Sequence, residues 1–266
     1  MWLAWFLTAV FYLLFYGPFT IFWAIFAGLT SWILPKRWRY PYIILTWSWF
    51  SLYAARWVLG IRWQVVGREH LPKQPVVIAA NHQSAWETFF LQTLINPQSQ
   101  VIKKSLLKIP FFGWTYGLLK PIAIDRTNPK SAMVQVVEQG KRVLTDGHHV
   151  LIFPEGTRRH PDQLGKFSKG AATLAQRADV PLLPVSLDAG RVWPASLWQP
   201  KRPGLITVTV HPPLISAKGD AFAVTQELQA VIHRSLHGER DTDPVEPIAH
   251  DDGDKEDTPT QEAFSS

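Results

Sequence analysis

The sequence lacks several features that mark common classes of enzyme. It contains no cysteine, which excludes a disulfide framework, a thiolate zinc site and a cysteine nucleophile. It also contains no G-x-S-x-G segment, the turn that carries the serine nucleophile of α/β-hydrolases. Residues 1–35 have no charged side chain. Since 47% of the 266 residues are hydrophobic and only 18% are charged, we expect most of the chain to fold.

Charge is divided between two regions of opposite sign. Residues 239–266 hold ten of the 21 acidic residues and two of the 27 basic ones, so this tail carries −8. The remaining 25 basic and 11 acidic residues give residues 1–238 a charge of +14. A basic body favours an anionic partner such as a phosphate compound or a lipid surface, and the acidic, proline-containing tail is expected to be disordered. We expect no nucleic-acid partner, because nine of the 13 tryptophans lie in residues 1–63, away from most of the basic residues.

Residues 1–60 are expected to form a hydrophobic helical membrane anchor. Two uncharged stretches, 1–35 and 40–55, flank a basic cluster. A helix over the first would run roughly 50 Å, longer than the roughly 30 Å hydrocarbon core, and Gly17-Pro18 predicts a break or kink near its middle. A buried hairpin of a soluble protein is one alternative. A signal peptide is another, but the sequence lacks the basic segment with which a signal peptide begins. Basic residues flank both ends of the second stretch, so whether the anchor spans the bilayer stays open.

From residue 61 onward, short apolar runs alternate with amphipathic stretches. The predicted strands cover residues 62–66, 75–80, 100–103, 121–124, 149–153, 182–187 and 205–210. The predicted helices cover residues 84–95, 129–145, 168–178 and 222–237. Asn128 before Pro129 is typical of a helix N-cap followed by proline in the first turn. This alternation predicts an α/β domain over residues 61–238, with a largely parallel sheet flanked by helices.

A histidine and a glutamate lie five residues apart, directly after the apolar run at 76–80. On a regular helix His82 and Glu87 would be about 140° apart, so they can meet only if His82 lies in a turn and Glu87 in the first turn of the next helix. Ser84, a good N-cap residue, favours this arrangement. Glu87 would then bind one imidazole nitrogen and leave the other as a proton acceptor, without a protein nucleophile. A capping box of Ser84 and Glu87, with His82 an ordinary loop residue, is the alternative.

Three further strand ends carry polar or basic turns. In F-P-E-G-T-R-R at 153–159, Gly156 permits close backbone approach to a ligand, Arg158 offers a planar fork for phosphate, and Glu155 could orient an arginine or bond a hydroxyl. The other two turns are residues 124–126 and residues 101–106. Alone, each is also typical of an ordinary surface turn. Together they predict a base beside an anion pocket, because ligands of parallel α/β sheets lie at the carboxyl ends of strands.

These segments resemble the 1-acylglycerol-3-phosphate O-acyltransferases and, more broadly, the glycerolipid acyltransferases with an H-x4-D box. The likeness runs from about residue 62 to residue 213. His82 and Glu87 are similar to the catalytic box, and residues 153–158 match the F-P-E-G-T-R block in every position. Residues 103–113, 124–126 and 180–185 are similar to the remaining blocks. The sequence departs from the family at Glu87, where aspartate is usual, and at Lys120 and Ala123, where glycine and an aromatic are common.

The resemblance implies transfer of an acyl chain from acyl-CoA or acyl-carrier protein to the sn-2 hydroxyl of lysophosphatidic acid, giving phosphatidic acid. It implies direct transfer without an acyl-enzyme, a metal or a cofactor. His82 would be the base and Glu87 its orienting group, with Asn81 a lesser candidate for orienting His82 or binding the oxyanion. The expected phosphate-binding residues are Arg158, Gly156, Glu155, Thr157, Arg126, Lys103 and Lys104.

The expected location is the bacterial inner membrane, with the catalytic domain on the cytoplasmic face. Two other functions stay open. One is acyl transfer to a different acceptor, such as another lysophospholipid, a lyso-ornithine lipid or a lipid A precursor, since Glu87 departs from the usual residue. The other is a non-catalytic, membrane-associated lipid-binding protein that uses the same pocket.

Overall fold

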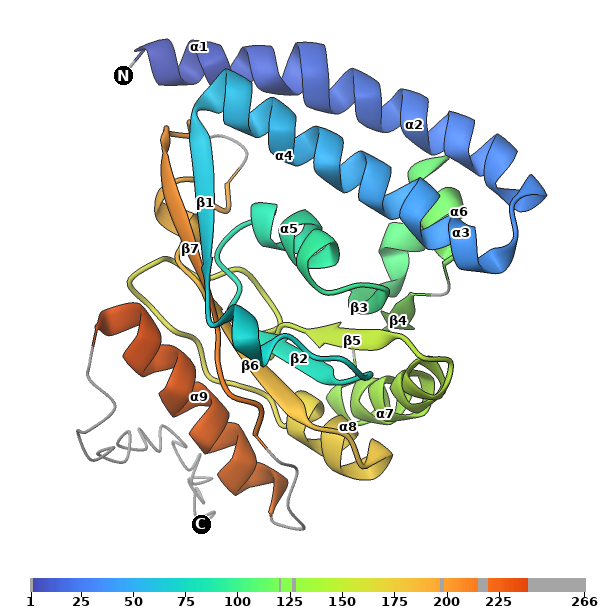
Figure 1. Ribbon diagram of the computed structural model, residues 1–266, viewed down its shortest axis with the longest axis vertical. Coiled ribbons are helices and arrows are strands. Elements are labelled where there is room, and N and C mark those ends of the chain that lie inside the picture. The colour runs from blue at the N-terminus through green and yellow to red at the C-terminus, as the bar shows by residue number, and fades with distance from the viewer. Residues whose placement is uncertain (1, 120, 126–127, 197–198, 215–219, 239–266) are drawn as a thin grey trace, which may run out of the picture.

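The computed structural model describes residues 2–119, 121–125, 128–196, 199–214 and 220–238. Within these ranges, a helical hairpin lies along one side of an α/β domain (Figure 1). The predicted disordered tail at 239–266 and the predicted phosphate ligand Arg126 lie outside the described residues.

The sheet has seven strands, and its order places the predicted site on neighbouring strands. The strands are β1 (Ile61–Val66), β2 (Val77–Ala80), β3 (Gln98–Lys103), β4 (Ile122–Ile124), β5 (His149–Ile152), β6 (Leu182–Leu187) and β7 (Gly204–Val210). Their order is β1-β7-β6-β2-β5-β3-β4, and all neighbouring pairs are parallel except β6–β7. All seven predicted strands are present, with ends within two residues, and the predicted fold class is confirmed.

Four helices of the domain were also predicted, and they cover the sheet. These are α5 (Trp86–Leu94), α7 (Pro129–Thr145), α8 (Gly170–Ala178) and α9 (Ala221–His237). The Asn128 side chain accepts a hydrogen bond from the Ser131 N–H at 3.1 Å, so the predicted N-cap of α7 is confirmed. The short helix α6 (Phe112–Gly117) and the 3-10 turn η5 (Lys104–Lys108) were not predicted.

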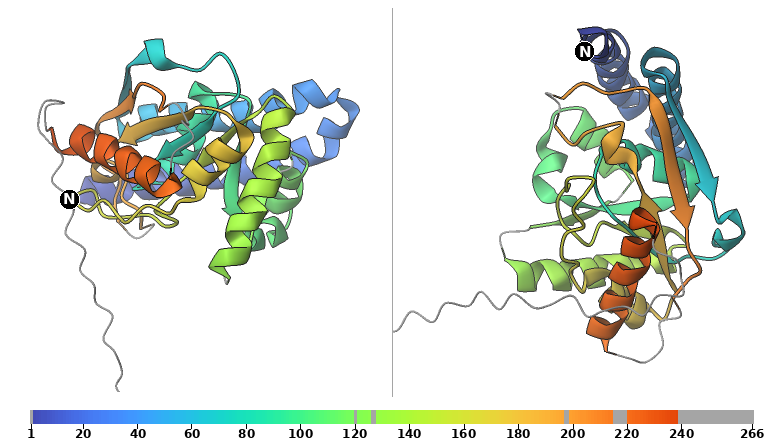
Figure 2. Two further views of the ribbon diagram at one scale, coloured as in Figure 1. Left: turned by 90° about the horizontal axis from the view of Figure 1, so that it is seen from below. Right: turned by 90° about the vertical axis from the view of Figure 1, so that its left-hand side faces the viewer.

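Two apolar cores form on the opposite faces of the sheet. On β2, Ile78 and Ala80 pack on the side of α5 and the hairpin, whereas Val77 and Ala79 pack on the side of α7, α8 and α9. Figure 1 and the right-hand view of Figure 2 accordingly show the hairpin at the top and the helices of the other face toward the bottom, with the sheet between them. Burial on both faces explains why β2 is a continuous apolar run without polar alternation.

The hairpin consists of two long helical arms that run side by side (Figure 1). The first arm contains α1 (Trp2–Val10), the π-helical turn η1 (Phe11–Tyr16), α2 (Gly17–Thr30) and the 3-10 turn η2 (Ser31–Ile33). The second contains α3 (Lys36–Tyr40), the π-helical turn η3 (Pro41–Leu45) and α4 (Thr46–Leu59).

A break or kink was predicted at Gly17-Pro18, and the break is wrong, because the chain stays helical through these residues. The Gly17 N–H donates to the Tyr12 carbonyl five residues earlier, which is the π-helical pattern. A Cβ atom at position 17 would lie 2.6 Å from that carbonyl oxygen, so glycine permits this close turn. The wider turn lies directly before Pro18, which stands in the first turn of α2 and has no N–H to donate to the ladder.

The outer surface of the first arm is apolar. Within the described residues, Trp2–Ile33 is the one helical stretch long and apolar enough to cross a membrane, with a mean hydropathy of 1.8 in its 18-residue window. Its most exposed large side chains are Trp2, Leu3, Phe6, Leu13, Leu14, Ile21, Phe22, Leu29, Trp32 and Ile33. The inner side packs on the domain, where Phe11 is fully buried and the Thr115 hydroxyl donates to the Ala24 carbonyl at 2.6 Å. An exposed apolar surface of this length is compatible with membrane association.

Candidate active site

The candidate site lies at the carboxyl ends of adjacent parallel strands. His82 follows β2, the F-P-E-G-T-R loop follows β5, and Lys103 ends β3. In the sheet these strands are direct neighbours, in the order β2-β5-β3. Segments that are far apart in the sequence therefore meet at the carboxyl ends of these strands, which is the meeting point that the sequence predicted.

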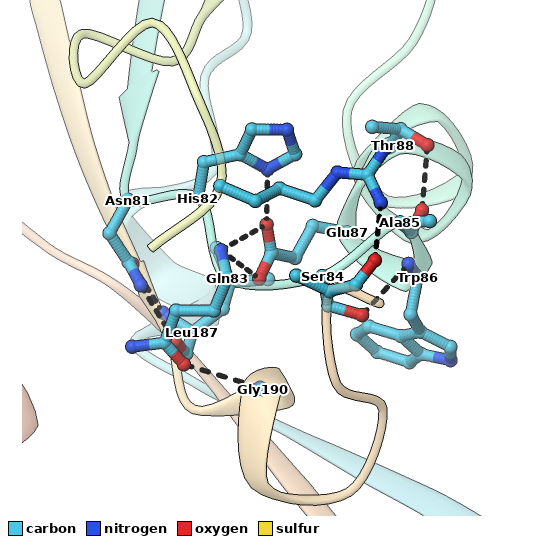
Figure 3. Close-up of polar contacts among 12 residues, drawn as sticks. Asn81, His82, Gln83, Ser84, Ala85, Trp86, Glu87, Thr88, Leu187 and Gly190 are labelled. Carbon is cyan, nitrogen blue, oxygen red and sulfur yellow. Dashed lines mark hydrogen bonds and ion pairs between the residues drawn. The ribbon is translucent and has the colours of Figure 1, made fainter. Parts of the chain in front are cut away.

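The structure brings His82 and Glu87 into contact. Imidazole Nδ1 lies 2.8 Å from Glu87 Oε2, with His82 in the turn after β2 and Glu87 in the first turn of α5 (Figure 3). The contact fixes the tautomer, because a neutral imidazole that donates from Nδ1 leaves Nε2 as a proton acceptor. In Figure 3 the rest of the ring points away from the carboxylate.

Glu87 is fully buried and is held by the backbone as well as by His82. Its carboxylate accepts the Gln83 N–H at 3.0 and 3.1 Å, while Ser84 Oγ accepts the Trp86 N–H (Figure 3). The N-cap of α5 is Ala85 and has no side-chain cap, so the predicted N-cap at Ser84 is wrong. Ser84 instead binds the N–H of Trp86, the first residue of the helix, and Glu87 contacts His82. Burial raises the pKa of the Glu87 carboxyl above its usual value, while the hydrogen bond and charge of His82 and the backbone N–H groups lower it.

The F-P-E-G-T-R loop holds the backbone of His82. The His82 N–H donates to Glu155 Oε1 at 2.7 Å, and the His82 carbonyl accepts the Arg159 N–H at 2.7 Å. The second oxygen of Glu155 accepts the Gly165 N–H at 2.8 Å. The imidazole also stacks on Phe153, with 4.0 Å between ring centroids and 19° between planes. Glu155 thus joins two loops and does not line the cavity, unlike the substrate-facing role expected from the sequence.

Asn81, expected either to orient His82 or to bind the oxyanion, does not line the cavity. Its amide donates to the Leu187 carbonyl and accepts the Leu187 N–H, both at 2.8 Å, and the residue is fully buried (Figure 3). Both side-chain groups are therefore engaged in joining the end of β2 to the end of β6. Asn81 supports the turn that carries His82 and is not placed to bind an oxyanion.

A cavity of about 740 Å³ opens beside His82. Apolar side chains from the hairpin, including Trp23, Ile43 and Trp47, line one part of it. The residues after the strand ends that line it are His82, Phe153, Gly156, Thr157 and Arg158, together with Lys103 at the end of β3. A cavity of this size with a mostly apolar lining and a few polar or charged groups fits a molecule that has a long apolar part and an anionic head.

The expected anion-binding residues differ in how well the structure places them. Arg158 lines the cavity and donates from Nη1 to the Ala195 carbonyl at 2.9 Å, but the rest of its guanidinium is exposed. Gly156 has φ +71°, and a Cβ atom there would meet open space. Lys103 lines the same cavity, whereas Lys104 is exposed on η5 and is not part of the lining. Among the described residues, no cluster of three His, Asp or Glu side chains could hold a metal ion.

Two of the contacts that the sequence did not predict differ in whether any signal could have found them. The stacking of Phe153 on His82 could have been found from the order of the strands, since Phe153 is the first residue after β5 and His82 the second after the neighbouring β2. The contact between Arg158 and the Ala195 carbonyl carries no sequence signal, because it depends on the path of an irregular loop.

Comparison with known proteins agrees with this geometry. A family model described as acyltransferase matches residues 62–188. The 1-acyl-sn-glycerol-3-phosphate acyltransferase of Pseudomonas aeruginosa is 45% identical over 221 residues, which cover 83% of this chain and 85% of that protein. The protein of the same name from Saccharomyces cerevisiae is 37% identical over 131 residues, covering 48% of this chain and 43% of the relative.

A solved structure shares the fold. The crystal structure of the 1-acyl-sn-glycerophosphate acyltransferase PlsC from Thermotoga maritima matches with a TM-score of 0.74 and 23% identity, covering 88% of this chain and 95% of that one. Taken with the sequence relatives, this shows that the chain is an acyltransferase and belongs to the 1-acyl-sn-glycerol-3-phosphate acyltransferase family.

Proposed function

We propose that the protein transfers a fatty acyl group from a thioester, acyl-CoA or acyl-carrier protein, to the sn-2 hydroxyl of 1-acylglycerol-3-phosphate. The observation that carries the proposal is that His82, which is hydrogen-bonded to Glu87, and Arg158 line one mostly apolar cavity. A base, a cation and an apolar chamber are the three features that a phosphorylated lysolipid and an acyl chain require together.

In this proposal His82 acts as the general base. Nε2 takes the proton of the acceptor hydroxyl while the hydroxyl oxygen forms a bond to the carbonyl carbon of the thioester. The tetrahedral intermediate then collapses, the C–S bond breaks, and the leaving thiolate receives the proton from the imidazolium. Atoms and charge balance without a covalent enzyme intermediate.

Glu87 orients and stabilises the base. Its hydrogen bond to Nδ1 keeps Nε2 unprotonated before the reaction, and its negative charge stabilises the imidazolium that forms during it. Burial makes this charge effective, because little water screens the pair. The glutamate therefore performs the role that an aspartate usually performs in the family.

Arg158 is proposed to bind the phosphate of the acceptor, with Gly156 and Thr157 beside it. A guanidinium can form two parallel hydrogen bonds with a phosphate, and only one nitrogen of Arg158 is used by Ala195. The positive φ of Gly156 turns the backbone in open space next to the guanidinium. Lys103, which lines the same cavity, is a further candidate.

We further propose that the hairpin anchors the enzyme in one leaflet of a membrane. The inner side of the first arm contacts α4, α6 and the loop before β7, while its outer side exposes large apolar residues. A helix that packs against the domain along its length fits an orientation in the plane of the membrane surface. Because hairpin residues also line the cavity, a lipid could enter it directly from the bilayer.

The test is thiol release from acyl-CoA and acyl-carrier protein by purified enzyme, with a panel of acceptors. The panel contains lysophosphatidic acid, a lysophospholipid with a phosphodiester head, a lyso-ornithine lipid and 1-acylglycerol without phosphate. The proposal expects the largest kcat/KM for lysophosphatidic acid with at least one donor. Faster transfer to an acceptor without a phosphate monoester would overturn the assignment of the substrate.

A further inference from the structure

A lysine is buried between the first membrane helix and the loop that contacts Arg158. Lys201 lies just before β7 and is 1% exposed. Lysine is almost never fully buried without partners, because moving an ammonium ion out of water is costly. The surroundings of Lys201 therefore indicate what the buried charge does.

The Lys201 ammonium ion is surrounded by backbone carbonyl groups of its own loop. Nζ donates to the Ser196 carbonyl at 2.8 Å and the Gln199 carbonyl at 3.0 Å, and a third carbonyl, that of Pro194, lies at 3.5 Å. Charge-assisted hydrogen bonds of this kind hold the backbone of residues 194–196 and of Gln199 in place. Both sides of Ala195, the residue that receives Arg158, are therefore held by the same cation.

The same residue is joined to the first arm of the hairpin. The Lys201 N–H donates to Thr8 Oγ1 at 2.8 Å, and Nζ lies 5.7 Å from the centroid of the Tyr12 ring. Next to this contact, Trp193 packs edge-on against Phe11 with 5.4 Å between ring centroids. The loop is thus fixed at one end to a helix that we propose lies in the membrane.

Arg158 is close enough for its charge to act on Lys201. Burial, and the nearby guanidinium in second place, lower the pKa of Lys201 to about 8. The ammonium of Lys201 and the guanidinium of Arg158 are therefore two cations kept near each other. The contacts that the structure gives for the Lys201 ammonium are carbonyl groups and an aromatic ring, and none is a carboxylate. An anionic ligand at Arg158 would relieve this repulsion, which favours binding of phosphate there.

We propose that Lys201 is a positioning residue for the acceptor phosphate: it ties residues 194–196 and Gln199 to the membrane helix and so holds the Ala195 carbonyl that orients Arg158. The inference rests on the proposed role of Arg158 and adds to it a link between the membrane helix and substrate binding. Lys201 itself does not touch the substrate, since its ammonium is enclosed by carbonyl groups and an aromatic ring.

The test measures KM for lysophosphatidic acid, KM for acyl-CoA, and kcat in Lys201→Met, Lys201→Arg, Arg158→Ala and the double variant. We expect Lys201→Met to raise the acceptor KM about tenfold while KM for acyl-CoA and kcat change less than about threefold. Lys201→Arg should restore most of the loss. In the Arg158→Ala background, Lys201→Met should add less than about twofold, because both substitutions act on the same guanidinium.

A matched control and a second variant keep the two proposals separable. Lys141→Met removes an exposed lysine on α7 and should change nothing. Thr8→Val removes only the hydroxyl that receives the Lys201 N–H, and should raise the acceptor KM about threefold even if Lys201→Met does not fold.

If Arg158→Ala leaves the acceptor KM unchanged, the proposed phosphate site fails. If Arg158→Ala raises KM but Lys201→Met raises it additively, or raises all parameters together, Lys201 is only a structural residue and the inference fails. An acceptor KM that is normal in both Lys201→Met and Thr8→Val overturns it as well.

Discussion

The two sides of the active site are built differently. On the base side, Glu87 is fully buried and has His82 and the Gln83 N–H as partners, and the His82 backbone is held at both its N–H and its carbonyl. On the anion side, Arg158 is exposed, and the contact that positions it is one loop carbonyl. The groups that we propose perform the chemistry are therefore fixed before a substrate binds, whereas the guanidinium that we propose binds the headgroup can adjust to it.

This difference predicts which kinetic constant each side controls. Substitutions on the base side should lower kcat, because preorganised groups act on the transition state. Substitutions on the anion side should mainly raise the acceptor KM, because phosphate contacts are present in the ground state as well. The following variants test that division, beginning with the largest expected effect.

Replacing His82 should have the largest effect on kcat. His82→Ala removes the proton acceptor, and we expect kcat to fall by about 10²–10⁴-fold with little change in the acceptor KM. Steady-state assays with acyl-CoA and lysophosphatidic acid measure both constants. His237→Ala, at the exposed end of α9, is the matched histidine control and should behave as wild type. Near-normal turnover by folded His82→Ala enzyme would remove the mechanism.

Glu87→Gln should separate activity from stability. An amide can donate to Nδ1 and so favour the wrong tautomer, and we expect kcat to fall about 10²-fold. Burial raises the pKa of the Glu87 carboxyl in the folded protein above its ordinary value of 4.5. As the pH rises from this ordinary value through the raised one, the carboxylate ionises less readily in the folded state than in the unfolded state, so the free energy of unfolding falls. The variant lacks this cost. Its Tm at pH 7 should therefore equal or exceed that of wild type, and its advantage should disappear toward pH 4.

A lower Tm for Glu87→Gln at pH 7 would show that the carboxylate contributes more through its hydrogen bonds than it costs through burial. A Glu87→Gln enzyme with wild-type kcat would contradict the orienting role directly.

Arg158→Ala should change binding more than turnover. We expect the acceptor KM to rise about 30-fold, with kcat within about threefold of wild type, because truncation removes a charged phosphate contact. Arg159→Ala is the matched control, since Arg159 is adjacent and exposed, and the N–H that binds the His82 carbonyl belongs to its backbone. An equal rise in KM for both variants would indicate a diffuse charge effect and not a specific phosphate site.

Gly156→Ala should have the smallest effect. A Cβ atom there meets nothing within 4 Å, so the expected cost is the strain of φ +71°, about 1 kcal/mol of the free energy of unfolding. Gly147→Ala has the same features, with φ +86° and open space, in the turn after α7. Both should lower Tm by a similar amount, but only Gly156→Ala should raise the acceptor KM, by a few-fold. If both variants raised the acceptor KM, the rise would come from a general loss of stability and not from a role of Gly156 in binding.

The sequence predicts the regular parts of this molecule well. All seven strands and four helices of the domain follow from hydrophobic periodicity and from caps such as Asn128, which are local signals. The contact between His82 and Glu87 was predicted because only one placement of a turn and a helix start lets them meet. The short helix α6 was missed because it depends on packing, including the contact of Thr115 with the Ala24 carbonyl.

Other features could not be read from local patterns. Gly17-Pro18 suggests a break, yet packing of the first arm on the domain keeps the chain helical and the ladder shifts to a π-helical turn. Asn81 and Glu155 look like substrate ligands, but they hydrogen-bond to backbone groups from distant segments. Lys201 lies between prolines and resembles a solvated loop lysine, and only the tertiary fold encloses it.

The most direct test of this division of labour compares two acceptors, lysophosphatidic acid and 1-acylglycerol, with wild-type, His82→Ala and Arg158→Ala enzyme. The measurement is the ratio of kcat/KM for the two acceptors. We expect His82→Ala to be slow with both acceptors while keeping the wild-type preference for phosphate, and Arg158→Ala to lose most of that preference. Loss of the preference in His82→Ala, or its retention in Arg158→Ala, would contradict the account.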